Sequence, residues 1–314
     1  MSGLAVDIRE RLSSLKIQRR SLGDSWDALH PPARPGGDWG LTLPSGIHCR
    51  LFDSAFSTLA KNRWKAGAKG SYATYFKQIS ESDLEDVRAF VEGFRPRVII
   101  EDLTEGSIAL AFRARRSEAG GPEPTELGQL MRDAKPYDET PSPQHQKAAA
   151  ELARRLCAFF ESMPFYGGVD GFVAVPSSNP TKKFSLPRGF AAELARHTGK
   201  ADFSSAVTKP RATPQMKNLS RTQKVEALLG SVTVDSAKVT GKTIVVVDDL
   251  YQSGLTLNYV AEELRAAGAN AVFGLAVVKT LRDDDNVPKT AGGPSGAPSA
   301  QADDDDLDDE IPFL

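Results

Sequence analysis

The sequence predicts an α/β fold with a doubly wound, mostly parallel sheet, a mainly helical N-terminal region and a disordered acidic C-terminal tail. In the second half of the 314-residue chain, short continuous apolar segments alternate with segments of helical period. Such strands are typical of a parallel sheet covered by helices on both faces. Beyond residue 282 the apolar periodicity stops, and Gly, Pro, Ser and Asp dominate. A segment of that composition cannot bury enough surface to order itself.

The N-terminal region, residues 1–96, contains three segments that we expect to be helical. The first runs from Leu4 to Arg20 and the second from Ala55 to Gln78, with a Pro- and Gly-rich loop at 30–40 between them. The third runs from Ser82 to Phe94, and Ser82 with Glu85 has the spacing of a capping box. The region should therefore be mainly helical.

Residues 97–282 carry the pattern of the parallel sheet. VIIED and SIALAFRAR, after Arg97, favour strands, and a loop is expected at 118–126. A helix is expected from Gln146 to Ser162, because its apolar residues share one face. The remaining expected elements are strands at 171–175, 244–247 and 271–278 and a helix at 188–197. Residues 283–314 form the linker and tail.

Composition limits the function classes. The formal net charge is −2, and seven carboxylates lie between Asp303 and Glu310, so the rest of the chain is mildly basic and suits anionic ligands. Two cysteines, Cys49 and Cys157, exclude a disulfide framework and a zinc site of paired cysteines. There is no run of 18 apolar residues and no apolar leader, so we expect a cytoplasmic protein without a membrane partner.

The segment IVVVDDLYQSGLT at 244–256 carries the chemistry. Asp248 and Asp249 end an apolar strand, and a helix follows. Ligands of α/β sheets bind at this edge, and the turn into the helix offers N–H groups to a phosphate. Gly254 allows close approach, and Ser253 and Thr256 add hydroxyl groups. The acids would repel a bare phosphate, so we expect them to accept hydrogen bonds from sugar hydroxyls and to help hold a cation.

A ribose 5-phosphate fits both halves of this segment. The alternative is an ordinary strand-to-helix turn with a capping acid. A Walker B site is less favoured, because no GxxxxGK[ST] loop occurs in the chain.

The same segment resembles the motif of type I phosphoribosyltransferases, and residues 125–282 resemble the ComF family. LGQLMRDAKPYD at 127–138 resembles its helix ending in a Lys-Tyr pair, here interrupted by Pro136. VAVPSS at 173–178 with PRGF resembles its first ligand loop, and RATPQMKNLSR at 211–221 resembles its mobile loop. The chain departs from the family in lacking a cysteine-rich module and in reading RTQKVEALLGS after that loop.

The resemblance implies a Mg²⁺-dependent phosphoribosyltransferase, a glycosyltransferase class, that binds phosphoribosyl pyrophosphate; no dedicated protein metal site is expected. It assigns Asp248 and Asp249 to the ribose hydroxyls and Ser177 and Ser178 to pyrophosphate. The 5-phosphate is assigned to Gln252, Ser253, Gly254, Leu255 and Thr256. Arg188, Arg211 and Arg221 are candidates to neutralise pyrophosphate, with solvated surface charges as the alternative.

The end of the chain, DDDDLDDEIPFL, resembles the acidic tip of bacterial single-stranded DNA-binding proteins. The resemblance implies partners that recognise such tips, with Asp308, Asp309, Glu310, Ile311, Pro312 and Phe313 as the binding residues. Leu314 departs from it, and a solubilising tail is the alternative.

Cations and aromatics also alternate between Lys61 and Lys77, as on single-strand binding surfaces, although an amphipathic helix with its aromatics packed inward explains them as well.

Two functions remain open from the sequence. The first is phosphoribosyl transfer to an unknown acceptor, linked to DNA metabolism through the tail. The second is a non-catalytic, ligand-sensing adaptor or regulator that recruits DNA-processing proteins. We keep the second because no acid or histidine can be placed at an acceptor site.

Overall fold

The computed structural model describes residues 2–22, 26, 28–57, 59, 63–69, 72–117, 121–136, 141–179, 184–214 and 219–281. The acidic tail, with the predicted partner-binding residues 308–313, lies outside the described residues, and so does Lys61.

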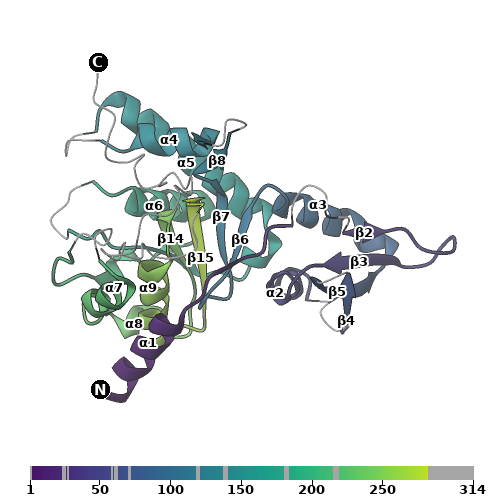
Figure 1. Cartoon of the computed structure of the whole chain (residues 1–314), viewed down its shortest axis with the longest axis horizontal. Coiled ribbons are helices and arrows are strands. Elements are labelled where there is room, and N and C mark those ends of the chain that lie inside the picture. The colour runs from purple at the N-terminus through teal and green to yellow at the C-terminus, as the bar shows by residue number, and fades with distance from the viewer. Residues whose placement is uncertain are drawn as a thin grey trace, which may run out of the picture.

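A seven-stranded, mostly parallel sheet forms the centre of the fold, in the order β1-β6-β7-β15-β14-β10-β11 (Figure 1). The parallel strands are β7 (Ser107–Phe112), β15 (Ala271–Lys279), β14 (Thr243–Tyr251), β10 (Gly171–Ala174) and β11 (Ala201–Asp202). At one edge, β6 (Val98–Glu101) and β1 (Gln18–Arg19) run antiparallel to their neighbours. The predicted sheet is confirmed.

Helices cover both faces of this sheet, as the alternation along β14 shows. Val245 and Val247 face a core formed with α4 (Glu126–Ala134), α5 (Pro143–Ser162) and α6 (Leu186–Thr198). Ile244 and Val246 face a second core formed with α1 (Ser2–Ser14), α7 (Arg221–Leu228), α8 (Ser236–Val239) and α9 (Leu255–Ala266). Burial on both faces explains why residues 244–247 of this strand are all apolar.

A second, four-stranded antiparallel sheet lies beside the main one, at the right of Figure 1. Its order is β2 (Leu29–His30), β3 (Trp39–Leu43), β5 (Tyr72–Ile79) and β4 (Lys65–Lys69). The accompanying helices are α2 (Gly46–Ala55) and α3 (Leu84–Phe94), which follows the 3₁₀ turn η2 (Glu81–Asp83). Residues of this sheet and of the main sheet share one apolar core.

The helix predicted from Ala55 to Gln78 is wrong, because residues 65–79 form the β4–β5 hairpin. The misleading residue is Lys77, which occupies an inward position of β5 and is 1% exposed. Its Nζ lies 2.5 Å from Asp53 Oδ1 and 4.4 Å from the centre of the Trp64 ring. Because this buried position carries a lysine, the sequence does not show the alternation of apolar and polar residues that is typical of a strand. The cation and aromatic pattern is therefore partly explained by packing inside this small sheet.

Two further N-terminal predictions change in detail. The first helix ends at Ser14, and residues 18–19 form β1. The helix predicted from Ser82 is confirmed as α3, but its N-cap is Asp83 without a side-chain cap, so the predicted capping box is wrong.

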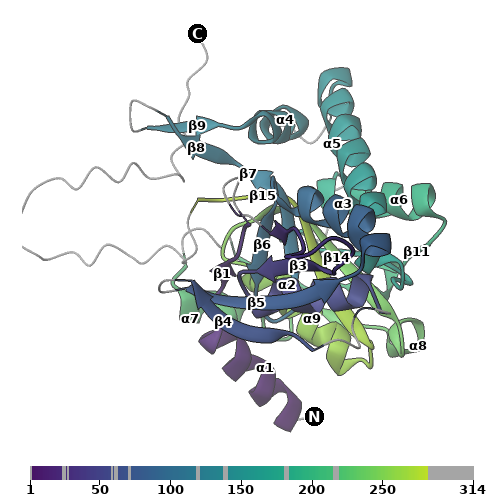
Figure 2. The same cartoon turned by 90° about the vertical axis from the view of Figure 1, so that its right-hand side faces the viewer.

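The smaller elements complete the fold. In Figure 2, β8 (Ala114–Arg116) and β9 (Pro122–Pro124) extend beside α4, so part of the loop expected at 118–126 is a strand. The other short elements are η3 (Pro164–Tyr166), η4 (Ser204–Ala206), β12 (Val207–Thr208) and β13 (Thr233–Val234). None of the helices in the described parts of the chain has the length and apolar character needed to cross a membrane.

Candidate active site

A cavity of about 430 Å³ lies at the carboxyl ends of β10 and β14. It is lined by the segments 175–178, 184–187 and 248–257, together with Lys135, Pro136, Lys224 and Leu228. Ser177, Ser178, Asp248, Asp249 and all five residues from Gln252 to Thr256 are among the lining residues. The structure thus brings together, from two crossovers of the sheet, the residues predicted to contact the ribose, the 5-phosphate and part of pyrophosphate.

The turn between β14 and α9 has the geometry of an anion-binding loop. Gly254, the N-cap of α9, has φ +74°, and no side chain caps the helix at this residue. A Cβ on Gly254 would lie 2.2 Å from the hydroxyl oxygen of Tyr251, so only glycine fits. The first N–H groups of a helix have no partner within it, and the helix dipole favours an anion there. This turn can therefore bind a phosphate.

The two acids at the end of β14 differ in environment. Burial, and then the charge of Asp249, raise the pKa of Asp248 well above its usual range. Asp248 Oδ1 accepts a hydrogen bond of 2.8 Å from the Asp249 N–H. Asp249 Oδ2 lies 3.3 Å from Lys135 Nζ, at the end of α4. Asp248 can therefore retain a proton above the pH range in which a carboxyl group usually loses it, while Asp249 lies beside a lysine.

A smaller cavity of about 230 Å³ adjoins the first and shares Val175, Pro176, Ser177 and Ser185 with it. Arg188 and Lys209 contribute positive charge to its wall. Burial, and then the charge of Arg211, lower the pKa of Lys209 to about 8. Its Nζ donates a hydrogen bond of 2.9 Å to Thr213 Oγ1. An anionic group that extends from the larger cavity would meet both cations.

The other two predicted arginines line neither cavity. The guanidinium of Arg211 donates to the carbonyl oxygens of Ala227 (3.2 Å) and Leu229 (2.9 Å), at the end of α7. The guanidinium of Arg221 donates to the carbonyl oxygens of Leu12 (2.9 Å) and Leu15, at the end of α1. Both bind carbonyl groups at helix ends, which carry partial negative charge.

Sequence reasoning missed three lysines at the two cavities. Lys135 lies in the predicted helix with the Lys-Tyr resemblance, so a signal for it existed. Lys224 is 3% exposed and lines the larger cavity from α7, but nothing in its sequence surroundings marks it. Lys209 lies just before the predicted mobile loop and was overlooked beside Arg211.

Comparison with known proteins agrees with the location of the site. Residues 188–290 match the model of the phosphoribosyl transferase domain family. This segment, less than half of the chain, begins within α6 and contains β14, the anion-binding turn, α9 and β15. The match supports a phosphoribosyltransferase domain in this part of the chain. No curated protein matches the chain in sequence.

Three enzymes of known structure have low similarity to the chain. The allosteric regulatory enzyme of purine biosynthesis has 16% identity and a TM-score of 0.33, covering 76% of this chain and 45% of its own. Leishmania donovani UMP synthase has 13% identity and a TM-score of 0.27, and the match covers 63% of this chain and 32% of the synthase. B. subtilis glutamine phosphoribosylpyrophosphate amidotransferase, complexed with ADP and GMP, has 16% identity and a TM-score of 0.33. This match covers 76% of this chain and 46% of the amidotransferase. The matched part spans less than half of each enzyme.

Proposed function

We propose that the chain binds phosphoribosyl pyrophosphate in the cavity at the end of β14 and transfers its phosphoribosyl group to an acceptor. One observation carries the proposal: two acids and an uncapped helix N-terminus face the same cavity within a segment that matches the phosphoribosyl transferase domain. A ligand with both sugar hydroxyls and a phosphate suits this pairing of groups.

Each part of the ligand has a partner of suitable chemistry. The 5-phosphate would accept hydrogen bonds from the turn between Gln252 and Thr256. The ribose hydroxyls would donate to Asp248 and Asp249. Pyrophosphate would extend past Ser177 and Ser178 toward Arg188 and Lys209 in the adjoining cavity. Departure of pyrophosphate leaves positive charge on the anomeric carbon and places negative charge near these cations.

The donor set fits Mg²⁺. Carboxylates are hard oxygen ligands, and Mg²⁺ is usually held by one or two of them together with phosphate oxygens of a substrate. Asp248 and Asp249 supply such a pair, and no group of three or more His, Cys, Asp or Glu side chains in the described part of the chain competes with it. When bound, Mg²⁺ would neutralise charge on pyrophosphate. Since the pKa of Asp248 is raised, its binding to a cation would release a proton.

The runner-up function is a ligand sensor without transfer activity. It is favoured by the positions of Arg211 and Arg221, whose guanidinium groups bind carbonyl oxygens and leave the cavity to other cations. In that case binding of phosphoribosyl pyrophosphate would persist without turnover. The resemblance to the ComF family, and the proposal that residues 308–313 recruit DNA-processing proteins, rest on the sequence alone.

The double variant Asp248→Asn/Asp249→Asn tests the binding site. Titration calorimetry with phosphoribosyl pyrophosphate and MgCl₂ should show binding to the wild type and a loss of at least about tenfold in the double variant, because an amide replaces a carboxylate acceptor by a donor. Glu193→Gln, an acid on α6 that pairs with Arg196, is the matched control and should bind as the wild type does. Equal affinity in the folded double variant would remove the acids from the site.

A second measurement separates transfer from sensing. Pyrophosphate release is followed with bound phosphoribosyl pyrophosphate, MgCl₂ and a panel of nucleobases and amines as acceptors. Release that depends on one acceptor and is lost in the double variant identifies an enzyme. Tight binding without acceptor-dependent release identifies a sensor.

A further inference from the structure

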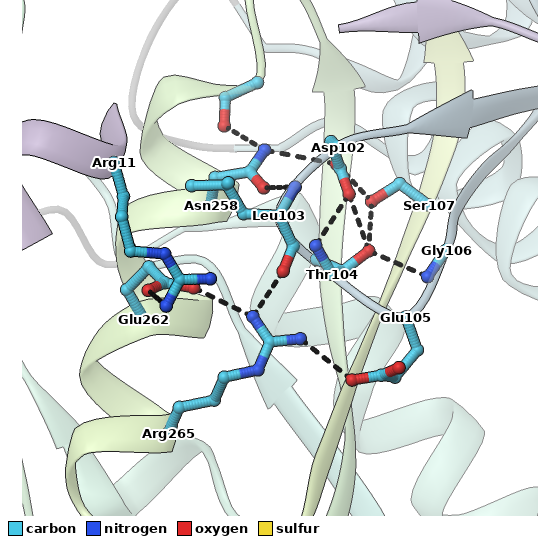
Figure 3. A network of polar contacts seen from close by, with 11 residues as sticks. Arg11, Asp102, Leu103, Thr104, Glu105, Gly106, Ser107, Asn258, Glu262 and Arg265 are labelled. Carbon is cyan, nitrogen blue, oxygen red and sulfur yellow. Dashed lines mark hydrogen bonds and ion pairs between the residues drawn. The ribbon is translucent and has the colours of Figure 1, made fainter. Parts of the chain in front are cut away.

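Asp102, in the turn between β6 and β7, accepts hydrogen bonds from five groups. Figure 3 shows its contacts with Thr104, Ser107 and Asn258. Oδ1 accepts from the N–H (2.9 Å) and hydroxyl (2.7 Å) of Thr104. Oδ2 accepts from the Ser107 hydroxyl (2.7 Å), the Tyr251 hydroxyl (2.7 Å) and the Asn258 amide (3.1 Å). One carboxylate thus joins its own turn to β14 and α9, which are about 150 residues further along the chain.

Two of these donors, Tyr251 and Asn258, also contact the anion-binding turn at Gly254. Tyr251, the last residue of β14, is 1% exposed, and its hydroxyl occupies the space that a Cβ of Gly254 would need. Asn258, in the first turns of α9, is fully buried and donates both to Asp102 and to the carbonyl oxygen of Gly254 (2.9 Å). Its Oδ1 accepts from the Leu103 N–H (2.9 Å). The backbone that surrounds the proposed phosphate site is therefore tied to Asp102 through two buried side chains.

A second group of contacts, which meets the first at Leu103, joins the same turn to the body of α9. Arg265 donates to the carbonyl oxygen of Leu103 and pairs with Glu105 at 3.1 Å. Arg265 also pairs at 2.8 Å with Glu262, which is 3% exposed and forms an ion pair with Arg11 of α1. Glu105 is half-exposed and bonds neither Tyr251 nor Asn258 in any contact that the structure describes. It offers a charge in the same turn with no direct link to the anion-binding turn.

We propose that Asp102 is a positioning residue for phosphate binding. By fixing Tyr251 and Asn258, it holds the backbone from Tyr251 to Gly254 in the conformation that presents the N–H groups of α9 to the 5-phosphate. The proposal rests on the proposed function for its ligand, although the ordering of the turn can be tested without one. Asp102 lies outside the segment that matches the phosphoribosyl transferase domain, so neither the motif nor the match indicates it.

The substitution Asp102→Asn perturbs this arrangement at one atom. An amide can still accept at one oxygen, but its NH₂ group would face donors at the other position. With the oxygen toward Tyr251 and Asn258, the NH₂ group faces the N–H of Thr104; with the orientation reversed, it faces Tyr251 and Asn258. Either orientation places donors against a donor in a part-buried site. Tyr251→Phe removes only the hydroxyl and serves as the milder variant.

The ligand-independent test is hydrogen exchange of two backbone amides that are bonded to the turn: that of Asn258, which donates to the carbonyl oxygen of Gly254 (2.9 Å), and that of Thr280, which donates to the carbonyl oxygen of Tyr251 (3.1 Å). Asp102→Asn should accelerate their exchange by about tenfold, corresponding to the loss of one hydrogen bond to a charged group, and Tyr251→Phe should do so to a smaller extent. Glu105→Gln should leave them unchanged. Exchange in β10 and the urea midpoint serve as controls for a general loss of stability. Unchanged exchange of the turn in the folded Asp102→Asn protein would overturn the proposal.

Calorimetry with ribose 5-phosphate and with pyrophosphate, each added alone, gives the second readout. Asp102→Asn should lower the affinity for ribose 5-phosphate about tenfold. It should leave the affinity for pyrophosphate unchanged, since pyrophosphate would lie in the adjoining cavity. Faster exchange with undiminished ribose 5-phosphate affinity, or an equal loss for both ligands, would overturn the role in phosphate binding. If the wild type binds neither compound while exchange responds as expected, the proposed function fails and the ordering of the turn by Asp102 stands.

Discussion

Gly254→Ala probes the turn at the end of β14 by adding a single methyl group. The left-handed backbone conformation at φ +74° costs a non-glycine residue about 1–2 kcal/mol. The added Cβ would lie 2.2 Å from Tyr251 Oη and 2.5 Å from Cζ, and these atoms belong to a buried ring whose hydroxyl is hydrogen-bonded to Asp102. Overpacking of this kind costs about 1–3 kcal/mol more. The free energy of unfolding should therefore fall by about 2–5 kcal/mol in total.

Gly241→Ala is the matched control, because Gly241 has φ +71° and a Cβ added there would meet no neighbouring group within 4 Å. It should lose only the conformational part, about 1–2 kcal/mol. Urea unfolding of both variants gives the difference, and calorimetry should show weakened binding of phosphoribosyl pyrophosphate in Gly254→Ala alone. Equal destabilisation of the two variants, with wild-type affinity in Gly254→Ala, would refute the close packing of Tyr251 under the turn.

Two further predictions concern the cations. Because the pKa of Lys209 is lowered to about 8, it loses its positive charge as pH rises through that value, and the affinity for phosphoribosyl pyrophosphate should fall between about pH 7 and about pH 9. Calorimetry across this range should show a flatter profile for Lys209→Arg, and parallel profiles would exclude Lys209 from the ligand. Arg221→Ala should lower the free energy of unfolding by about 1–3 kcal/mol through lost bonds to the carbonyl groups of Leu12 and Leu15. The affinity of this variant for phosphoribosyl pyrophosphate should change less than about twofold. A loss of about a hundredfold would indicate that Arg221 contacts pyrophosphate.

The central sheet could be predicted because both of its faces are buried. Residues 244–247 of β14 are therefore apolar at every position, and the two acids that come next within the strand mark where continuous burial ends. The turn into α9 was equally readable, because Gly254 and its neighbours meet a local geometric need. Local features of this kind can be inferred from neighbouring residues.

The parts that could not be predicted depend on distant contacts. Lys77 looks like a surface residue until Asp53 and Trp64 are placed beside it, so the β4–β5 hairpin was mistaken for a helix. The side chains of Arg211 and Arg221 point to the ends of α7 and α1, and the positions of these helix ends are set by the tertiary fold. Asp102 has no local signal, since its partners on β14 and α9 come together only in the folded sheet.

The most direct test of the central claim is a crystal structure of the protein with phosphoribosyl pyrophosphate and Mg²⁺. We predict the 5-phosphate within hydrogen-bonding distance of backbone N–H groups between Gln252 and Thr256, with the ribose hydroxyls on Asp248 and Asp249. A ligand bound elsewhere, or one whose pyrophosphate occupies the turn in place of the 5-phosphate, would contradict this prediction.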